Sequence, residues 1–231
     1  MFTFFFWSEW FFWQGIAVLL ILYTGLLALG SGFIQFNFFL KSTNQLSRDG
    51  ISLTFDDGPD PITTPKILDI LKANNVKASF FLIGRKAKDY PDIVKRIQEE
   101  GHVIGNHSYS HSNFLPLLPG VLLKRDILKC NELLNKLTGS HVTLFRPPFG
   151  VTNPNYRRVL RKLRLTSVGW SLRSLDTTAK SAQEVLNKVI PGLKNSDIVL
   201  LHDTQESTIE ALPTIIEECH KNGMAIVSLD L

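Results

Sequence analysis

The chain has 231 residues and a formal net charge of +4, with 25 Lys and Arg against 21 Asp and Glu. This mild positive charge suits an anionic surface or polymer, but the basic residues are spread along the chain and give no nucleic-acid signature. All 25 basic residues and 20 of the 21 acids follow residue 40, and the part that contains them is long enough for one domain with a full core.

The N-terminal 40 residues differ in composition from the rest. No charged side chain lies between Trp10 and Leu40, and residues 16–29 are nearly all apolar. As a helix rising about 1.5 Å per residue, this run can cross a hydrocarbon core of about 30 Å. Trp7 and Trp13 flank Trp10 at one end, where an aromatic belt would lie.

We therefore expect residues 1–40 to be a membrane anchor that contacts the bilayer through residues 10–33. A cleaved signal peptide is the alternative, although no Lys or Arg precedes the apolar run. Residues 41–50 read as a polar linker, and residues 51–231 as one folded domain.

Beyond residue 50, segments with strand and helix patterns alternate through short connections. The predicted strands cover residues 51–55, 77–83, 102–106, 142–145, 165–172, 197–201 and 224–229. The predicted helices cover residues 65–72 and 91–100, a long stretch that ends at Gly139, residues 155–162, a stretch capped by Ser181, and residues 208–221. The long helix has an apolar stripe of Leu122, Ile127, Leu133, Leu134 and Leu137. This alternation predicts an α/β fold with a parallel sheet, closed as a barrel or left open.

The two cysteines, Cys130 and Cys219, each fall in a predicted helix. We expect two buried free thiols, and a disulfide is the alternative. The sequence gives no indication of the oligomeric state.

Residues 53–59, Leu-Thr-Phe-Asp-Asp-Gly-Pro, place two adjacent carboxylates at the end of the first predicted strand. Asp56 and Asp57 would repel each other and lose hydration there, which is tolerable when a cation or a proton is shared between them. The same letters also fit an ordinary acidic turn.

Other polar side chains follow other strands: His107, His111, Arg146, Asp176 and His202. In a parallel βα barrel the carboxyl ends of the strands share one face, so these side chains would converge. The two histidines at i and i+4, with one Asp, match a ligand set for catalytic Zn²⁺ that keeps an open position. A solvated Ser/His-rich loop is the alternative. No Glu follows His107, so the metalloprotease pattern is absent and a general base must come from elsewhere, the spare carboxylate of the Asp pair being the candidate.

Four motifs in this order resemble the polysaccharide deacetylase family, carbohydrate esterase family four. They are Thr-Phe-Asp-Asp-Gly-Pro at 54–59, His-Ser-x-x-His at 107–111, Arg-Pro-Pro-Phe-Gly at 146–150 and Leu-His-Asp at 201–203. The resemblance covers about residues 50 to 231. It implies a deformed (β/α) barrel of about seven parallel strands, here preceded by one transmembrane helix. It also implies a metal-dependent hydrolase that removes N-acetyl groups from sugar polymers, so an N-acetylated glycan is the expected partner.

The resemblance assigns roles to the residues that match these motifs. Asp57, His107 and His111 would hold the divalent metal, with Zn²⁺ as the expected ion. Asp56 would be the general base that deprotonates the attacking water, and Arg146 would pair with it. An adjacent arginine keeps such a carboxylate ionised, so that it can accept a proton.

On the other side of the site, the resemblance makes His202 the general acid that protonates the leaving amine. Asp176 would orient His202, and the backbone N–H of Phe149 would help hold the oxyanion. Two positions depart from the family pattern, because Arg173 stands where an Asp is usual and Thr177 where a Trp is usual. These departures bear on substrate contacts more than on the metal site.

Two alternatives keep the same fold: an amide hydrolase that acts on a non-sugar substrate, and a non-catalytic glycan-binding protein. The substrate class implied by the resemblance is extracytoplasmic, so we expect the domain outside the membrane. The flanking charges, Glu9 before the apolar run and Lys41 and Arg48 after it, point weakly to the opposite orientation.

Overall fold

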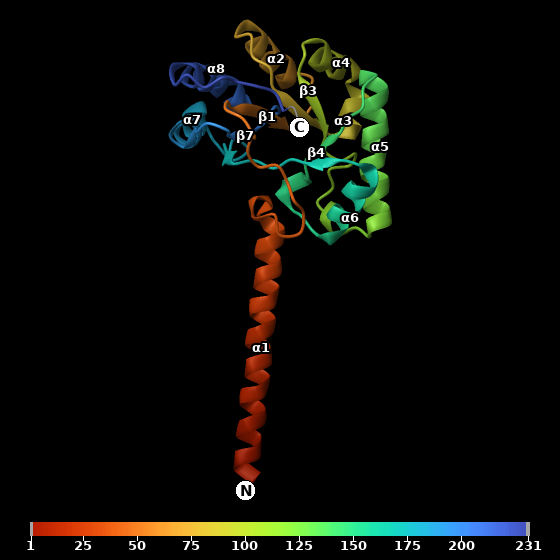
Figure 1. Cartoon of the computed structure of the whole chain (residues 1–231), viewed down its shortest axis with the longest axis vertical. Helices are drawn as coiled ribbons and strands as arrows, with labels where there is room; N and C mark the ends of the chain where they lie inside the picture. Colours follow the sequence, from red (N-terminus) through yellow and green to blue (C-terminus); the bar gives the residue numbers. More distant parts are fainter. Residues whose placement is uncertain (1, 230–231) are drawn as a thin grey trace.

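The computed structural model describes the backbone of residues 2–229 and, among these, the side chains from residue 10 onward. A single long helix, α1 (Phe2–Gly32), projects away from a curled sheet that is surrounded by helices (Figure 1). Among the described residues, one helical stretch, Trp10–Gly32, is long and apolar enough to cross a membrane.

The sheet has seven strands in the order β5-β4-β3-β2-β1-β7-β6, and every pair of neighbours is parallel. The strands are β1 (Ser52–Asp56), β2 (Ser79–Leu82), β3 (Val103–Asn106), β4 (Leu144–Phe145), β5 (Thr166–Ser167), β6 (Leu172–Arg173) and β7 (Ile198–His202). The expected α/β fold with about seven parallel strands is confirmed. The sheet curls without closing, because β5 and β6 form its two edges.

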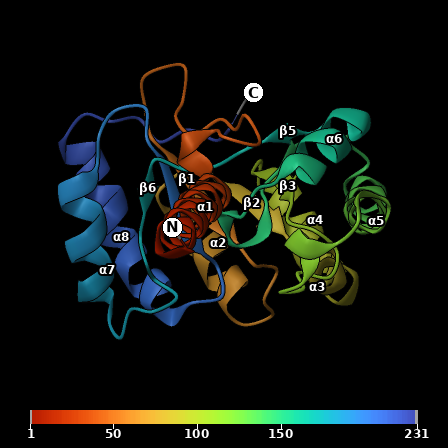
Figure 2. The same ribbon diagram turned by 90° about the horizontal axis from the view of Figure 1, so that it is seen from below.

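The helices are α2 (Thr63–Ala73), α3 (Gly84–Asp89), α4 (Pro91–Glu99), α5 (Gly120–Thr138), α6 (Pro154–Leu163), α7 (Ala182–Val189) and α8 (Glu206–Lys221). Ser181 caps α7 as predicted, with its hydroxyl accepting from the Glu184 backbone N–H. Seen along α1, helices α7 and α8 flank the sheet on one side and α5 and α6 on the other, with α1 in front of the curl (Figure 2).

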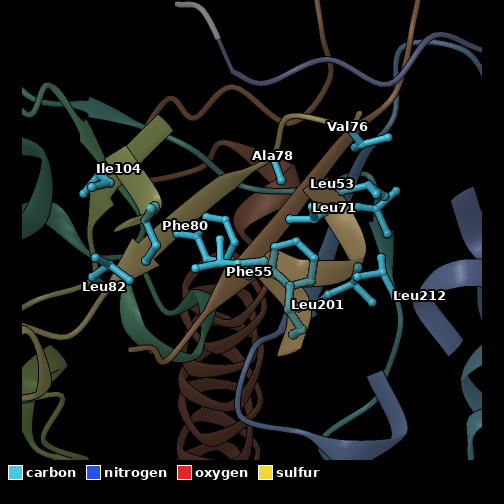
Figure 3. Packing of buried hydrophobic residues seen from close by; sticks show 14 of the residues in the cluster. Leu53, Phe55, Leu71, Val76, Ala78, Phe80, Leu82, Ile104, Leu201 and Leu212 are labelled. Atoms are coloured by element: carbon cyan, nitrogen blue, oxygen red, sulfur yellow. The ribbon is translucent and has the colours of Figure 1, made fainter. Parts of the chain in front are cut away.

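Two hydrophobic clusters lie on the two faces of the sheet. Alternate strand residues such as Leu53 and Phe55 pack outward against the helices (Figure 3), and the Phe55 and Phe80 rings stack with centroids 5.0 Å apart. The opposite face, inside the curl, buries Phe81 and Leu200. Because strand neighbours point to opposite faces, the polar Thr54 also points inside the curl, toward the candidate site.

Two predicted strands are wrong in detail. Residues 165–172 were expected as one strand, but they form β5 and β6 at opposite edges of the sheet. The backbone of Thr43 pairs with the stretch between β5 and β6. Its carbonyl accepts from the Gly169 N–H and its N–H donates to the Ser167 carbonyl, at 2.9 Å each. A Cβ on Gly169 would meet the end of the Asn44 side chain, which would have to shift. Residues 224–229 form no strand and contribute one bridge, between Ile226 and Ile51.

The segment from residue 33 to residue 50 packs along the opening of the curl. Ile34, Leu40 and Leu46 are buried, and the Leu46 N–H donates to the Ser196 carbonyl at 2.8 Å. The part of this segment predicted as a polar linker, residues 41–50, therefore supplies backbone partners to strand edges that would otherwise lack them.

Cys130 on α5 and Cys219 on α8 are both free and buried, as expected. Leu122 departs from the predicted stripe of α5. It is 47% exposed, and Leu123 lies on the buried face in its place, together with the predicted Ile127 and Leu134.

Candidate active site

The predicted site residues converge at the carboxyl ends of the strands. Asp56 ends β1 and His202 ends β7, and the two residues are paired in register across the sheet. A cavity of about 260 Å³ opens there, lined by Asp56, Asp57, His107, His111, Phe149, Gly150, Trp170, Arg173, Thr177, Leu200 and His202. The other two predicted residues, Arg146 and Asp176, lie behind this lining and contact Asp56 and His202.

Asp57, His107 and His111 form one cluster whose candidate ligand atoms all lie within 4.8 Å of one another. The Nε2 atoms of His107 and His111 are 3.4 and 3.1 Å from the same carboxylate oxygen, Oδ1 of Asp57. When His107 and His111 are protonated, their charge outweighs the effect of burial and holds the pKa of Asp57 well below its ordinary value.

The hydrogen bonding of His107 makes this cluster a fit for a cation. Its Nδ1 lies 2.8 Å from the Arg146 carbonyl, which can only accept, so Nδ1 carries the proton. In the neutral ring, Nε2 then carries no proton and presents a lone pair to Asp57 Oδ1. This Asp57 oxygen is buried and has no hydrogen-bond donor. Electron-rich atoms that face one another in this way match a metal-ligand set whose histidine is oriented by a carbonyl.

The loop that carries the two histidines is held by hydrogen bonds to Asp126 of α5, which the sequence did not predict. The Asp126 carboxylate accepts from the Tyr109 N–H at 2.8 Å and from the Ser110 N–H at 3.2 Å. The Ser108 hydroxyl accepts from the His111 N–H at 3.0 Å. A lone Asp on an amphipathic helix resembles any solvated side chain, so no sequence signal identified Asp126.

Asp56 is held by the buried guanidinium of Arg146. The Nη1 atom of Arg146 donates to Asp56 Oδ1 at 2.7 Å and to Thr54 Oγ1 at 2.8 Å. The Nη2 atom donates to the Gly169 carbonyl at 2.8 Å. The Phe81 ring covers the guanidinium, with its centroid 4.1 Å from Cζ. Burial lowers the pKa of Arg146 more than Asp56 raises it, yet an arginine remains charged at neutral pH.

His202 is oriented by Asp176. Its Nδ1 lies 2.7 Å from Asp176 Oδ1, while Oδ2 accepts from the His202 N–H and from the Thr208 hydroxyl at 2.6 Å each. Burial would lower the pKa of His202, but the Asp176 carboxylate raises it above its ordinary value. Because Nδ1 is bound to Asp176, Nε2 is the ring nitrogen available to the cleft.

Phe149 and the two positions that depart from the family pattern, Arg173 and Thr177, line the cleft. Phe149 has a left-handed backbone (φ 61°), and Asp57 (φ 74°) and His111 (φ 47°) share this uncommon conformation. Left-handed residues other than glycine are costly, and they gather at sites where geometry matters more than stability.

A family model described as polysaccharide deacetylase matches residues 43–168, more than half of the chain. The peptidoglycan-N-acetylglucosamine deacetylase of Bacillus cereus is 40% identical over 183 residues. That match covers 78% of this chain and 66% of the relative, just under two thirds of its length.

Two solved structures share the fold. The Bc1960 peptidoglycan N-acetylglucosamine deacetylase superposes with a TM-score of 0.77 at 37% identity, covering 81% of this chain and 90% of that chain. BA3943 from Bacillus anthracis, described as a CE4 family pseudoenzyme, superposes with a TM-score of 0.74 at 28% identity. This second match covers 79% of this chain and 64% of that chain. Similar architecture therefore occurs in proteins described as deacetylases and in one described as a pseudoenzyme.

Proposed function

Because this chain belongs to the polysaccharide deacetylase family, we propose that it is a metal-dependent hydrolase that removes N-acetyl groups from N-acetylhexosamine units of a polysaccharide or oligosaccharide. One observation carries the proposal. The Asp57–His107–His111 cluster lies in one cleft with two differently held groups, Asp56 fixed by a buried cation and His202 fixed by a buried anion.

Asp57, His107 and His111 would hold the ion, and Zn²⁺ is the ion we expect because the set combines two imidazoles with one carboxylate. A divalent ion bound there would supply Lewis acidity toward the amide carbonyl and lower the pKa of the attacking water. Asp57 Oδ1 faces both imidazoles and is buried without a hydrogen-bond donor. A bound ion would give this oxygen a partner, which supports the assignment.

Asp56 is the proposed general base. Its Oδ1 is occupied by Arg146, and Oδ2 lies 3.8 Å from His107 Nε2, on the cleft side. Arg146 bonds one oxygen of Asp56 and restricts the orientation of the carboxyl group, so the other oxygen is positioned to take a proton from water.

His202 is the proposed general acid for the leaving amine. A protonated imidazole is favoured by the Asp176 carboxylate, which raises the pKa of His202. Water adds to the carbonyl carbon, the C–N bond breaks, and the amine leaves with the proton from His202 Nε2. The backbone N–H of Phe149, which also lines the cleft, would donate to the developing oxyanion.

Acetate release from a panel of N-acetylated glycans tests the proposal. The full-length, metal-loaded protein is incubated with acetylated peptidoglycan fragments, chitooligomers and surface polysaccharides, and mass spectrometry follows the mass loss per acetyl group. A small N-acetyl amide serves as the non-sugar comparison, and the Asp56→Asn variant serves as the inactive control. Turnover of the small amide alone would support the non-sugar alternative. Glycan binding without any turnover would support a binding protein.

We also propose that α1 anchors the protein in a membrane with the remaining domain on the extracytoplasmic side. The length and apolar composition of Trp10–Gly32 support the anchor. The side of the membrane follows from the substrate class, since polymers of N-acetylhexosamine lie outside the cytoplasm.

A further inference from the structure

The C-terminal end of α1 contacts a loop that forms a wall of the cleft. The Ser31 carbonyl accepts from the Thr152 N–H at 2.9 Å, and the Ser31 hydroxyl donates to the Thr152 carbonyl at 2.7 Å. Thr152 lies two residues after Gly150, which lines the cleft. Ser31 belongs to the stretch Trp10–Gly32 that can cross a membrane. The end of the membrane helix is therefore hydrogen bonded to the loop that continues from the cleft lining.

The segment that follows α1 packs onto the domain and does not act as a flexible linker between the helix and the domain. Ile34 is 1% exposed and packs in the cluster that contains Trp170, a residue of the cleft wall. Leu40 is buried, and Thr43 is hydrogen bonded to both neighbours of Val168. A domain held in this way cannot swing away from the bilayer, so the cleft stays near the membrane surface.

The surface around this junction is apolar and basic. Its exposed aromatic and aliphatic side chains are Phe33, Phe36, Phe38, Phe114, Leu117, Val121 and Leu122. Two hydrogen bonds join this surface to the loop that contacts α1. Asn153 in the loop donates to the Pro116 carbonyl at 2.6 Å, and Asn155 donates to the Leu118 carbonyl. Its exposed cations are Lys41, Lys124, Arg125, Arg157, Arg158 and Arg161. Apolar and cationic side chains together suit an anionic bilayer surface.

The side of the molecule away from α1 has a different character. Helices α2 and α4 lie there, across the sheet from α1 (Figure 1). Within the described residues, the large exposed apolar side chains next to these helices are Ile62 and Tyr90, one at the start of each helix. The apolar surface therefore gathers on the side from which the membrane helix leaves.

We propose that the cleft acts on N-acetylated saccharides that a lipid carries at the bilayer surface, rather than on polymer that lies farther from the membrane. This inference rests on the proposed deacetylase function. Substrate and enzyme that share one bilayer meet at a raised effective concentration. The lipid end of such a substrate would lie beside the exposed phenylalanines at residues 33, 36 and 38, and its sugar would reach the cleft.

A pair of substrates with one saccharide tests the proposal. An N-acetylglucosamine tetramer is offered either free in solution or coupled through its reducing end to a dialkylglycerol, in vesicles of phosphatidylcholine and phosphatidylglycerol that contain the full-length protein. We expect acetate release from the coupled tetramer to be at least about tenfold faster at equal total concentration. A flexible Gly/Ser insertion of about 20 residues between Gly32 and Phe33 should remove most of this advantage, while the rate on the free tetramer stays the same. The matched control carries the same insertion between Asn74 and Asn75, an exposed turn after α2.

Each outcome separates this inference from the proposed function. Hydrolysis of the free tetramer without preference for the coupled one would overturn the inference and leave the deacetylase function intact. An advantage that survives the insertion after Gly32 would also overturn it. No hydrolysis of either form would overturn both.

A measurement without turnover tests the same arrangement. Thiol-reactive fluorophores are placed at Leu117→Cys and at Lys72→Cys, because Cys130 and Cys219 are buried. A quencher carried on the lipid headgroup should quench the label at residue 117 severalfold more than the label at residue 72, which lies on α2. Equal quenching at both positions would contradict the placement of the cleft at the bilayer.

Discussion

Arg146 and Asp56 form a buried ion pair. The 2.7 Å contact between Nη1 and Oδ1 joins an arginine of 0% exposure to an aspartate of 3% exposure. The guanidinium also donates to the Thr54 hydroxyl and to the Val168 and Gly169 carbonyls. Two buried charges stabilise a fold only as long as both are present, because removal of one leaves the other without compensation.

Replacing Arg146 with methionine should therefore destabilise the protein strongly, by about 3–5 kcal/mol. The double variant Arg146→Met/Asp56→Asn should lose less than the sum of its single variants, because neither charge is then left alone. Chemical denaturation in detergent micelles measures both effects. The control is Arg96→Met, which removes partly exposed pairs with Asp69 and Glu100 that should contribute about 1 kcal/mol or less each. Equal destabilisation by the two arginine variants would contradict the inferred role of burial.

The proposed metal site predicts a loss of bound metal when its ligands are removed. His107→Ala should strip most of the metal and abolish activity, because the remaining pair is an incomplete ligand set. Elemental analysis of the purified protein measures the occupancy, and His220→Ala, an exposed histidine at the end of α8, is the control. Full occupancy in the double variant His107→Ala/His111→Ala would place the metal elsewhere.

Neighbouring Asp56 and Asp57 should respond differently to the same substitution. Asp56→Asn should keep the metal and lower kcat by about 10²–10⁴-fold, which is the usual effect of removing a general base. Asp57→Asn should weaken metal binding itself, since its Oδ1 atom faces both imidazoles. Metal titration combined with kinetics separates the two cases. If the first variant loses metal and the second retains it, the two roles are reversed.

The pairing of His202 with Asp176 predicts a specific pH effect. Asp176 raises the pKa of His202, and a general acid must be protonated, so kcat/KM should fall as pH rises through that pKa. Asp176→Asn should lower the pKa of His202 and move this alkaline limb to lower pH. Asp69→Asn, on the exposed side of α2, is the control that should leave the limb in place. A limb that does not move in the Asp176 variant would show that another group sets it.

The convergence of the site could be predicted from sequence because each motif directly follows a strand. Parallel strands end at one edge, so Asp57, His107 and His202 had to lie near one another once the order of βα units was known. The sequence did not predict how these side chains are held. Asp126 holds the histidine loop through backbone N–H groups, and nothing in the letters of α5 distinguishes that contact from solvation.

The edges of the sheet could not be predicted for a different reason. Residues 165–172 fit one strand by their local pattern, and the division into β5 and β6 depends on pairing with Thr43, more than a hundred residues away in the chain. Leu122 was assigned to a buried stripe because spacing alone cannot distinguish a core position from an exposed apolar position next to it.

The orientation of the protein in the membrane is the last prediction. Lys41 and Arg48 follow the apolar run and Glu9 precedes it, so a count of flanking charges would keep the domain in the cytoplasm. Two basic residues are a small bias, however, and long domains translocate largely regardless of charge. The arginines of α6 lie on the surface around the junction, where they can bind anionic headgroups on either side. We therefore expect a phosphatase reporter that is active only after export to work when fused after Leu231. A cytoplasm-only reporter at the same position should be silent. The reverse pattern would place the domain inside, where the lipid-carried saccharide would have to be a precursor that has not yet crossed the membrane.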